Sequence, residues 1–415
     1  MARRWPWLLV PVALLGAWAF LRPSPPPPPP LPEPEPRAAL PPDEPATVAL
    51  GEALATAQAA YGPDTTRWTA LDRALLVVGP PEPADLALWR PYAAAFAPLR
   101  AALARPGLRL NDNLKVQGVG IYRAWLLASA LALRAWDHTL EGAPELGVQD
   151  LLLATTLGTR LVDAADQGGE VDVGALILWT SLRELGELLA CANDPAALDA
   201  ARGLDALRPR PGATLRVLER ECWVEERRAL AFYGRPGSSG TLFALGLSPQ
   251  VDRLHLPRRL TDAVANQLLY DPASLVQALR ARCAALRTEL EKPPGARVSL
   301  RDGDAATRGG LRWLLDDPIA HAGSMYLSFV ETIAAREEIA QAAPGVLLVW
   351  VAAQQQLLET GRAPNTAIEL VPTRLAELPA DPYSSVHIRL DHGRVWSLGA
   401  PASDPDAPPL ALPIE

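Results

Sequence analysis

Residues 22–45 place the strongest limit on local structure in this chain, because they read RPSPPPPPPLPEPEPRAALPPDEP. Proline fixes φ at about −65° and lacks a backbone N–H, so a stretch this rich in proline forms neither helix nor sheet. We expect an extended polyproline II segment that rises about 3.1 Å per residue and reaches roughly 70 Å. A spacer is its favoured role, and a docking strip for a proline-binding partner is the alternative.

An apolar run precedes this proline-rich segment. Residues 5–21, WPWLLVPVALLGAWAFL, carry no charge and follow Arg3 and Arg4. The run is at the short limit for crossing a hydrocarbon core of about 30 Å, and arginines before it favour a cytoplasmic N-terminus. We therefore expect a single-pass transmembrane helix that inserts residues 5–21 into the bacterial inner membrane, with the C-terminal body in the periplasm.

The sequence leaves open whether residues 5–21 are cleaved. Residues 17–19, Ala-Trp-Ala, have the small-x-small form of a signal-peptidase site, and cleavage there would give a secreted protein. An uncleaved signal-anchor is favoured because the proline-rich tether follows at once. Export from the cytoplasm is common to both interpretations.

The body of the chain is predicted to be helical. From Ala46 to about Arg362, apolar residues recur at helical spacing between prolines and glycines. The connections are short, which favours neighbouring antiparallel helices. Asp194-Pro195 and Asp271-Pro272 are typical of an N-cap followed by proline at the first helical position. The expected fold is mainly α, a multi-helix array of antiparallel helix hairpins with a small C-terminal β-hairpin.

The expected organisation has five parts. They are a transmembrane anchor or signal peptide at 1–21, a proline-rich linker at 22–45, a helical domain at 46–343, a helix plus β-hairpin unit at 344–399, and a disordered tail at 400–415. The helix of the fourth part is expected from about Pro344 to Thr360, before Gly361, a residue suited to the left-handed position after a helix. Two strands then flank residues 391–393, Asp-His-Gly, which are predicted to form a three-residue hairpin loop.

The motifs of this fourth part follow a recognisable order. LLETGRAPNTAIELVP, LPADPYS, two predicted strands and SLG come one after another, and this order resembles the end of type II secretion major pseudopilin heads. The chain from about Asn113 to Gly399 is also similar to a group of uncharacterised exported bacterial proteins, in which an alanine- and leucine-rich helical body precedes the same ending. The residues that match the pseudopilin pattern are Gly361, Pro364, Leu370, Leu378, Pro379, Asp381, Pro382, Tyr383, Ser397, Leu398 and Gly399.

The resemblance implies one functional alternative, an accessory protein of a type II secretion or pilus system. It does not imply filament assembly, because a polyproline tether stands where pseudopilins have a hydrophobic N-terminal helix. Some heads of that family hold Ca²⁺ after SLG. Here the Gly-x-Asp-Gly pattern is missing, and Asp404 and Asp406 are expected to be solvated tail acids rather than calcium ligands.

No catalytic, cofactor-binding or metal-ligating residues are predicted, and no cofactor is expected. The five histidines are isolated, and neither HExxH nor CxxC occurs. Three acid doublets, Glu225-Glu226, Asp316-Asp317 and Glu337-Glu338, are expected on solvated helix faces or at helix ends. The net charge of −8, with acids and arginines interleaved, argues against a nucleic-acid partner, and no phosphate-binding loop indicates a nucleotide.

Glu184 and Glu187 lie within an apolar helical pattern. A polar stripe on an amphipathic helix is the favoured interpretation. The alternative is a buried acid, at either position, that is paired with Arg183.

The three cysteines, Cys191, Cys222 and Cys283, match no zinc or redox spacing. Buried free thiols that pack as small apolar groups are the favoured interpretation. A disulfide between Cys191 and Cys222 is the alternative, provided that their helices are neighbours.

These features predict a membrane-tethered extracytoplasmic helical protein that binds or scaffolds other proteins of the cell envelope and is not an enzyme. Helical arrays without a polar constellation usually bind through surface shape. One alternative is an enzyme that processes a cell-wall polymer with acids brought together by the fold. The other is the secretion or pilus accessory protein that the C-terminal resemblance implies.

Overall fold

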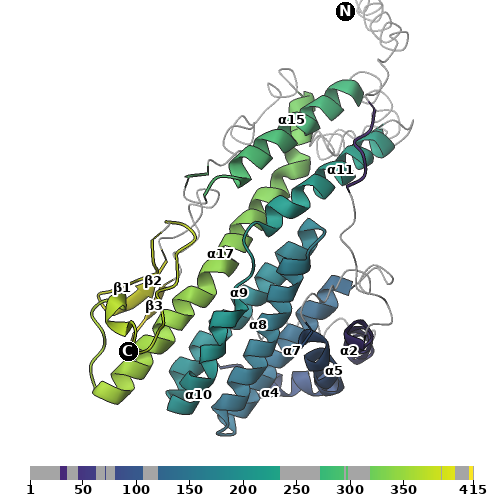
Figure 1. Ribbon diagram of the computed structural model, residues 1–415. Coiled ribbons are helices and arrows are strands. Elements are labelled where there is room, and N and C mark those ends of the chain that lie inside the picture. The colour runs from purple at the N-terminus through teal and green to yellow at the C-terminus, as the bar shows by residue number, and fades with distance from the viewer. Residues whose placement is uncertain are drawn as a thin grey trace, which may run out of the picture. The chain divides into compact units, whose positions relative to one another are not determined.

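The computed structural model describes residues 29–34, 45–61, 71, 80–105, 120–233, 272–293, 296–297, 318–384, 386–397 and 411–414. These residues are mainly helical, as predicted, with a small antiparallel sheet (Figure 1). The predicted membrane segment, residues 5–21, lies outside them. Within the described ranges, no helix combines the length and the apolar character that a bilayer-spanning segment needs.

The chain divides into two compact units. Unit 1 comprises residues 1–35, 218–289 and 299–331, and unit 2 comprises residues 36–217, 290–298 and 332–415. The first helices of unit 2 are α2 (Pro45–Tyr61), α4 (Pro83–Leu86), the 3₁₀ helix η1 (Ala87–Tyr92), α5 (Ala93–Leu103), α7 (Gly120–Leu140), α8 (Pro144–Ala164), α9 (Gly168–Ala192), α10 (Pro195–Ala200) and the 3₁₀ helix η2 (Ala201–Leu207).

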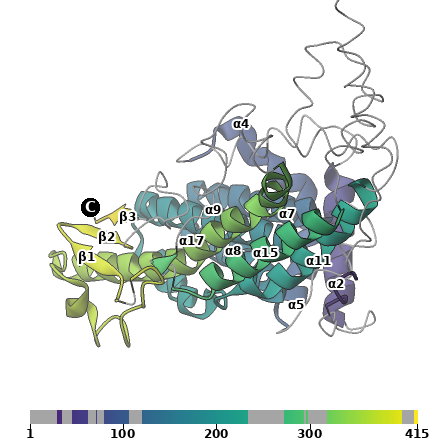
Figure 2. The ribbon, with the colours of Figure 1, turned by 90° about the horizontal axis from the view of Figure 1, so that it is seen from above.

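Helices α7, α8 and α9 form the core of unit 2, and they lie side by side in both views (Figures 1 and 2). Short connections join them, as predicted for antiparallel neighbours. Leu131, Leu157 and Leu178, one from each helix, are completely buried. The predicted N-cap before α10 is confirmed, because the Asp194 carboxylate accepts a hydrogen bond from the backbone N–H of Ala196 at 2.7 Å.

Gly158 of α8 and Gly174 of α9 let these two helices approach closely. A Cβ added at Gly158 would lie 2.8 Å from the carbonyl oxygen of Gly174 and 2.9 Å from the backbone nitrogen of Leu178. Both atoms belong to the backbone of α9, so they cannot move aside as the end of a side chain can. The packing of this helix pair therefore requires glycine at position 158.

We expect Gly158→Ala to lower the free energy of unfolding by about 1–3 kcal/mol, the usual cost of an extra methyl group in a packed core. The control is Gly169→Ala in the first turn of α9, where nothing lies within 4 Å of the added Cβ. The control should be neutral or stabilising by about 0.5–1 kcal/mol, because alanine favours a helix more than glycine does. Urea unfolding followed by circular dichroism measures both variants, and equal values would contradict the close approach.

The described part of unit 1 consists largely of parts of three helices, α11 (Ala213–Tyr233), α15 (Pro272–Leu290) and α17 (Pro318–Thr360). Residues 218–233 of α11, 272–289 of α15 and 318–331 of α17 belong to it. Helix α15 begins at the proline predicted to start it. The preceding Asp271 lies outside the described residues.

The helix predicted to start at about Pro344 starts instead at Pro318 and runs through Pro344. The domain boundary predicted at 343/344 therefore falls inside a continuous helix. An internal proline costs about 3 kcal/mol through a lost N–H and a clash with the preceding turn. Burial offsets that cost, because every residue from 342 to 355 is buried. The end at Thr360 is confirmed, and Gly361 follows with a φ of +69°.

Three short antiparallel strands, β1 (Arg389–Asp391), β2 (Arg394–Trp396) and β3 (Ala411–Pro413), form one sheet in the order β1-β2-β3. Asp391 pairs with Arg394, so the predicted three-residue loop is a two-residue turn, His392-Gly393. Both turn residues have positive φ, 46° and 70°, which suits the natural twist of a hairpin. The tail predicted to be disordered contributes β3, in which Leu412 pairs with the buried Val395.

Candidate functional site

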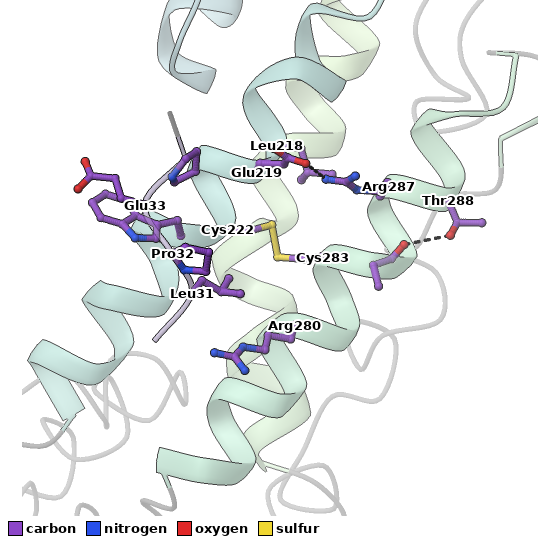
Figure 3. Close-up of a pocket in the computed structure, with 13 residues that line it drawn as sticks. Leu31, Pro32, Glu33, Leu218, Glu219, Cys222, Arg280, Cys283, Arg287 and Thr288 are labelled. Atoms are coloured by element: carbon purple, nitrogen blue, oxygen red, sulfur yellow. Dashed lines mark hydrogen bonds and ion pairs between the residues drawn. A yellow bond between two sulfur atoms is a disulfide. The ribbon is translucent and has the colours of Figure 1, made fainter. Parts of the chain in front are cut away.

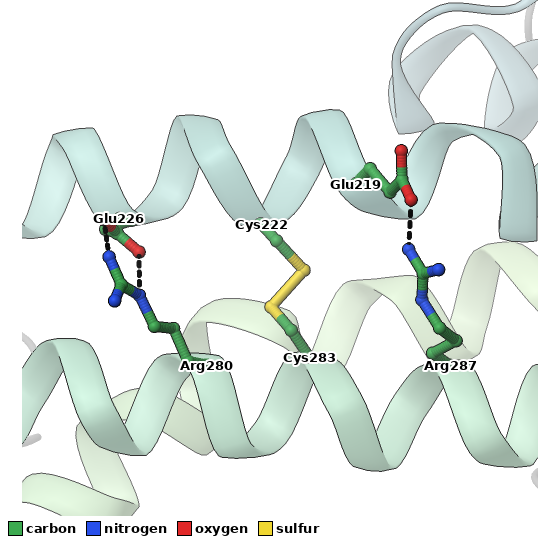
Figure 4. The surroundings of a disulfide bond; sticks show 6 residues. All are labelled: Glu219, Cys222, Glu226, Arg280, Cys283 and Arg287. Atoms are coloured by element: carbon green, nitrogen blue, oxygen red, sulfur yellow. Dashed lines mark hydrogen bonds and ion pairs between the residues drawn. A yellow bond between two sulfur atoms is a disulfide. The ribbon is translucent and has the colours of Figure 1, made fainter. Parts of the chain in front are cut away.

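A disulfide joins α11 to α15 within unit 1 (Figure 4). It links Cys222 and Cys283, whose Cα atoms are 6.2 Å apart. About one helical turn away, the Arg280 guanidinium donates two hydrogen bonds to the Glu226 carboxylate, each at 2.9 Å. The acid comes from α11 and the arginine from α15, so the ion pair and the disulfide together fix the register of the antiparallel helices.

Both helices carry the same spacing around their cysteine. Helix α11 reads E-x-x-C-x-x-x-E from Glu219, and α15 reads R-x-x-C-x-x-x-R up to Arg287. An antiparallel arrangement sets each acid opposite an arginine, and Glu219 indeed pairs with Arg287. This complementary spacing is a sequence signal from which the disulfide could have been predicted.

The structure corrects the prediction for the cysteines. The sequence pattern favoured buried free thiols, but Cys222 and Cys283 are bonded to each other. The alternative, a bridge between Cys191 and Cys222, is wrong as well, because Cys191 is free and exposed. The periodic pattern placed all three residues on helices without showing which helices are neighbours.

A cavity of about 650 Å³ lies along this helix pair, and we call it the α11–α15 groove (Figure 3). The disulfide, Trp223, Arg280, Arg287 and residues 31–34 of the proline-rich segment are among its lining. Ligand sites in proteins commonly have this size and combine an apolar lining with a few polar groups. The groove is therefore the candidate binding site of unit 1.

Residues 29–34 of the proline-rich segment are docked on this groove. The N–H of Leu31 donates to Glu226 Oε1 at 3.0 Å, and Arg280 Nη2 donates to the carbonyl oxygen of Pro29 at 2.6 Å. The hydrogen bond to Glu226 raises the pKa of Arg280, which keeps the guanidinium protonated. The predicted free spacer therefore does not describe residues 29–34, which contact the chain's own helices.

Trp223 lines the same groove, and its indole nitrogen is a hydrogen-bond donor that the described residues leave unsatisfied. Its Nε1–H is buried and has no hydrogen-bond partner in the described part of the chain. The Arg227 guanidinium lies over its ring, 4.8 Å from the ring centroid. A buried donor without an acceptor is costly, so a ligand that brings an acceptor to this indole would gain binding energy.

A second cavity, of about 220 Å³, lies in unit 2 and is lined by two glutamates. Glu337 accepts hydrogen bonds at 2.7 Å from the backbone N–H groups of Ala213 and of Thr214, at the start of α11. A carboxylate at this position also interacts favourably with the helix dipole. Glu338 forms an ion pair with Arg297.

Two of the three acid doublets are thus buried, and the prediction that they lie on solvated faces is wrong. The side chains at 225–226 and at 337–338 are all less than one-tenth exposed. For Glu226, Glu337 and Glu338, partners distant in the sequence explain the burial, because arginines or a helix N-terminus supply the compensating charge or donors. Helical periodicity does not show such partners. The third doublet, at 316–317, lies outside the described residues.

Burial raises the pKa of Glu338 from its ordinary 4.5 to about 7, against the lowering effect of Arg297. Because the pKa of Glu338 is higher in the folded than in the unfolded state, ionisation of this carboxyl lowers the stability of the fold. This cost is absent below pH 4.5 and grows as the pH rises to 7. At 1.36 kcal/mol for each pKa unit, we expect the chain to lose about 3 kcal/mol of unfolding free energy across this window because of Glu338.

The measurement is urea unfolding at pH 5 and pH 8 for the wild type and Glu338→Gln. The variant cannot ionise at this position, so its stability should fall less between the two pH values. The control is Glu141→Gln, which removes an exposed carboxylate and should keep the wild-type pH dependence. A Glu338→Gln variant with the same pH dependence as the wild type would contradict the raised pKa.

Glu184 on α9 is a buried acid paired with Arg183, which confirms the alternative and corrects the favoured polar stripe. Its carboxylate accepts hydrogen bonds from Trp136 Nε1 at 2.9 Å and from Arg183 Nη2 at 2.7 Å. Burial raises the pKa of Glu184, while both hydrogen bonds lower it. Glu187 is partly exposed and lies 3.7 Å from Arg183.

Residues of the pseudopilin-like motifs meet at Asp381, which is buried. Its carboxylate accepts hydrogen bonds from Ser397 Oγ at 2.8 Å, from the backbone N–H of Tyr383 at 3.1 Å and from Ser384 Oγ at 3.3 Å. These bonds tie the LPADPYS segment to the end of β2. The aspartate and the serine of the two motifs thus have a structural role in this chain.

Among the described residues, no group of three or more His, Cys, Asp or Glu side chains is arranged to hold a metal ion. The calcium candidates Asp404 and Asp406 lie outside those residues. No family model, curated protein or solved structure matches the chain.

Proposed function

We propose that the chain is a membrane-tethered protein of the bacterial cell envelope that binds or scaffolds other envelope proteins and does not act as an enzyme. The observation that carries this proposal is the α11–α15 groove, which holds an extended peptide, residues 29–34, by hydrogen bonds to the peptide backbone. Backbone hydrogen bonds combined with apolar surface are a general means of binding extended protein segments.

The disulfide between Cys222 and Cys283 supports a location outside the cytoplasm. Disulfides form and persist in oxidising compartments such as the periplasm and are rare in the reducing cytosol. The N-terminal apolar run and the proline-rich tether point to the same location.

A reporter and a thiol measurement test the location. Alkaline phosphatase fused behind Pro45 should be active, because this reporter folds only outside the cytoplasm. In the full chain, a maleimide should label Cys191 before reduction, and it should label Cys222 and Cys283 only after reduction and denaturation. An inactive reporter, together with labelling of all three cysteines without reduction, would overturn the proposal.

Site-specific photocrosslinking in intact cells tests the binding role. A photoreactive residue at Thr288, which lines the groove, should give a discrete adduct with an envelope protein that mass spectrometry identifies. The same residue at Glu141, which is exposed in unit 2, is the control and should not give that adduct. Identical adduct patterns at the two positions would argue against a specific binding role for the groove.

One observation favours a second candidate, an enzyme that processes a cell-wall polymer. Glu338 lines a cavity and has a pKa of about 7, which suits a general acid at neutral pH. The only other acid described in the lining of that cavity, Glu337, is already held by two backbone N–H groups. If the purified full chain hydrolyses peptidoglycan and Glu338→Gln abolishes the activity, this candidate replaces the first.

A further inference from the structure

We propose that the α11–α15 groove recognises a proline-rich segment of a partner protein in the polyproline II conformation, and that residues 29–34 of the chain occupy the groove as a built-in competitor. The inference rests on the proposed function and adds to it the chemical class of the ligand. Three features of the groove support this assignment. They are a donor directed at a proline carbonyl, an acceptor for the backbone N–H of Leu31, and space that residues 31–34 leave unfilled.

The first feature is a donor directed at a proline carbonyl. A polyproline II segment has no internal hydrogen bonds, so its carbonyl groups stay available to a binding surface. Arg280 Nη2 donates to the carbonyl oxygen of Pro29 at 2.6 Å. The same guanidinium is held by two hydrogen bonds to the buried Glu226 carboxylate. The donor is therefore oriented by the body of the protein before any peptide binds.

The second feature sets the register of the peptide. Prolines fill every position from 25 to 34 except Leu31 and Glu33, so Leu31 carries the one backbone N–H between Ser24 and Glu33. That N–H donates to Glu226 Oε1 at 3.0 Å. A peptide shifted by one residue would present a proline nitrogen to Glu226 and lose this hydrogen bond. The groove therefore distinguishes one non-proline position within a proline-rich ligand.

The third feature points to an occupant other than this segment. The cavity of about 650 Å³ remains open with residues 31–34 in place as part of its lining. The buried Nε1–H of Trp223, another lining residue, also finds no acceptor in the described part of the chain. Indole N–H groups and aromatic rings are the usual means of binding proline-rich ligands. The identical segment of a second copy would leave the same space and the same indole unfilled, so we assign the groove to a different protein.

Fluorescence anisotropy tests this inference with a defined probe, a labelled peptide with the sequence of residues 25–36, PPPPPPLPEPEP. The protein is the full-length chain in detergent, in which residues 29–34 are replaced by glycine and serine. We expect saturable binding to this variant and binding at least about tenfold weaker to the wild type, because a tethered segment competes at a high effective concentration. Absence of saturable binding to the replaced variant would overturn the proposal.

Two changes test the hydrogen bonds. A peptide with Leu31→Pro lacks the N–H and should bind about tenfold more weakly, as expected for the loss of a hydrogen bond to a charged group. This change leaves the protein untouched, so a folding defect cannot explain the result. In the protein, Glu226→Gln should also weaken binding, whereas Glu141→Gln, which removes an exposed carboxylate of unit 2, should not. Equal affinity of the two peptides would overturn the assignment.

The oligomeric state separates a partner from a second copy. We expect the wild-type chain to keep the same mass at all concentrations in light scattering, after correction for detergent. A dimer that forms through exchange of residues 29–34 would overturn the assignment to a different protein. An inactive reporter behind Pro45 would instead reject the proposed function, whatever the result with the peptide.

Discussion

Replacement of Trp136 by alanine is expected to lower the free energy of unfolding by about 3–5 kcal/mol. Trp136 lies on α7 and is completely buried, and it is among the largest fully buried side chains of the described residues. Its loss leaves a large void between α7 and its neighbours. It also removes a hydrogen bond to the buried Glu184 carboxylate, a partner whose pKa is already raised by burial.

Trp136→Phe separates the hydrogen bond from the packing. Phenylalanine keeps much of the apolar contact but leaves Glu184 without the indole donor, which should cost about 1–3 kcal/mol. The control is Trp396→Phe, which removes an indole hydrogen bond of 3.0 Å to Asp391 on the exposed hairpin. That loss should cost at most about 1 kcal/mol, because water replaces the donor. Chemical denaturation measures all variants, and equal costs for the two phenylalanine variants would contradict the role of the indole at Glu184.

Loss of the disulfide is the second change with a large expected effect. The bridge between Cys222 and Cys283 closes a loop of 61 residues, and the chain-entropy relation gives a stabilisation of about 4 kcal/mol for a loop of this length. We therefore expect the double variant Cys222→Ser, Cys283→Ser to unfold at a lower urea concentration than the oxidised wild type. Reduction of the wild type should reproduce most of this loss.

Cys191→Ser is the control for the disulfide variant. This cysteine is free and exposed, so its replacement should change the unfolding free energy by no more than about 0.5 kcal/mol. A double variant as stable as this control would show that the bridge does not constrain the unfolded chain. A loss of peptide binding in the double variant would further indicate that the bridge holds the α11–α15 groove in shape.

The parts of the fold that follow local rules could be predicted from the sequence. Apolar residues at helical spacing indicated α7, α8 and α9 as neighbouring helices joined by short connections. Asp194 and Gly361 marked a helix start and a helix end, because capping depends on a few adjacent residues. The hairpin was predicted as well, although its turn proved to be one residue shorter.

The features that depend on partners distant in the sequence could not be predicted in this way. Pro344 resembles a helix start, yet continuous burial of its surroundings keeps it inside α17. Glu226 and Glu338 resemble solvent-facing acids until Arg280 and Arg297, which lie 54 and 41 positions away in the sequence, are found beside them. The docking of Leu31 on α11 bridges 195 positions of the sequence, and no periodic pattern records such a contact. The groove was missed for this reason.

The docked position of Pro29 has a mechanical consequence if residues 5–21 span the bilayer as proposed. Pro29 follows Leu21 by only eight residues, and eight residues extend to at most about 29 Å. A partner that displaced residues 29–34 would free the whole proline-rich stretch, which extends to roughly 70 Å. Occupancy of the α11–α15 groove would then change how far the body can move from the lipid surface. Tension on the chain would in turn change how readily a partner displaces residues 29–34.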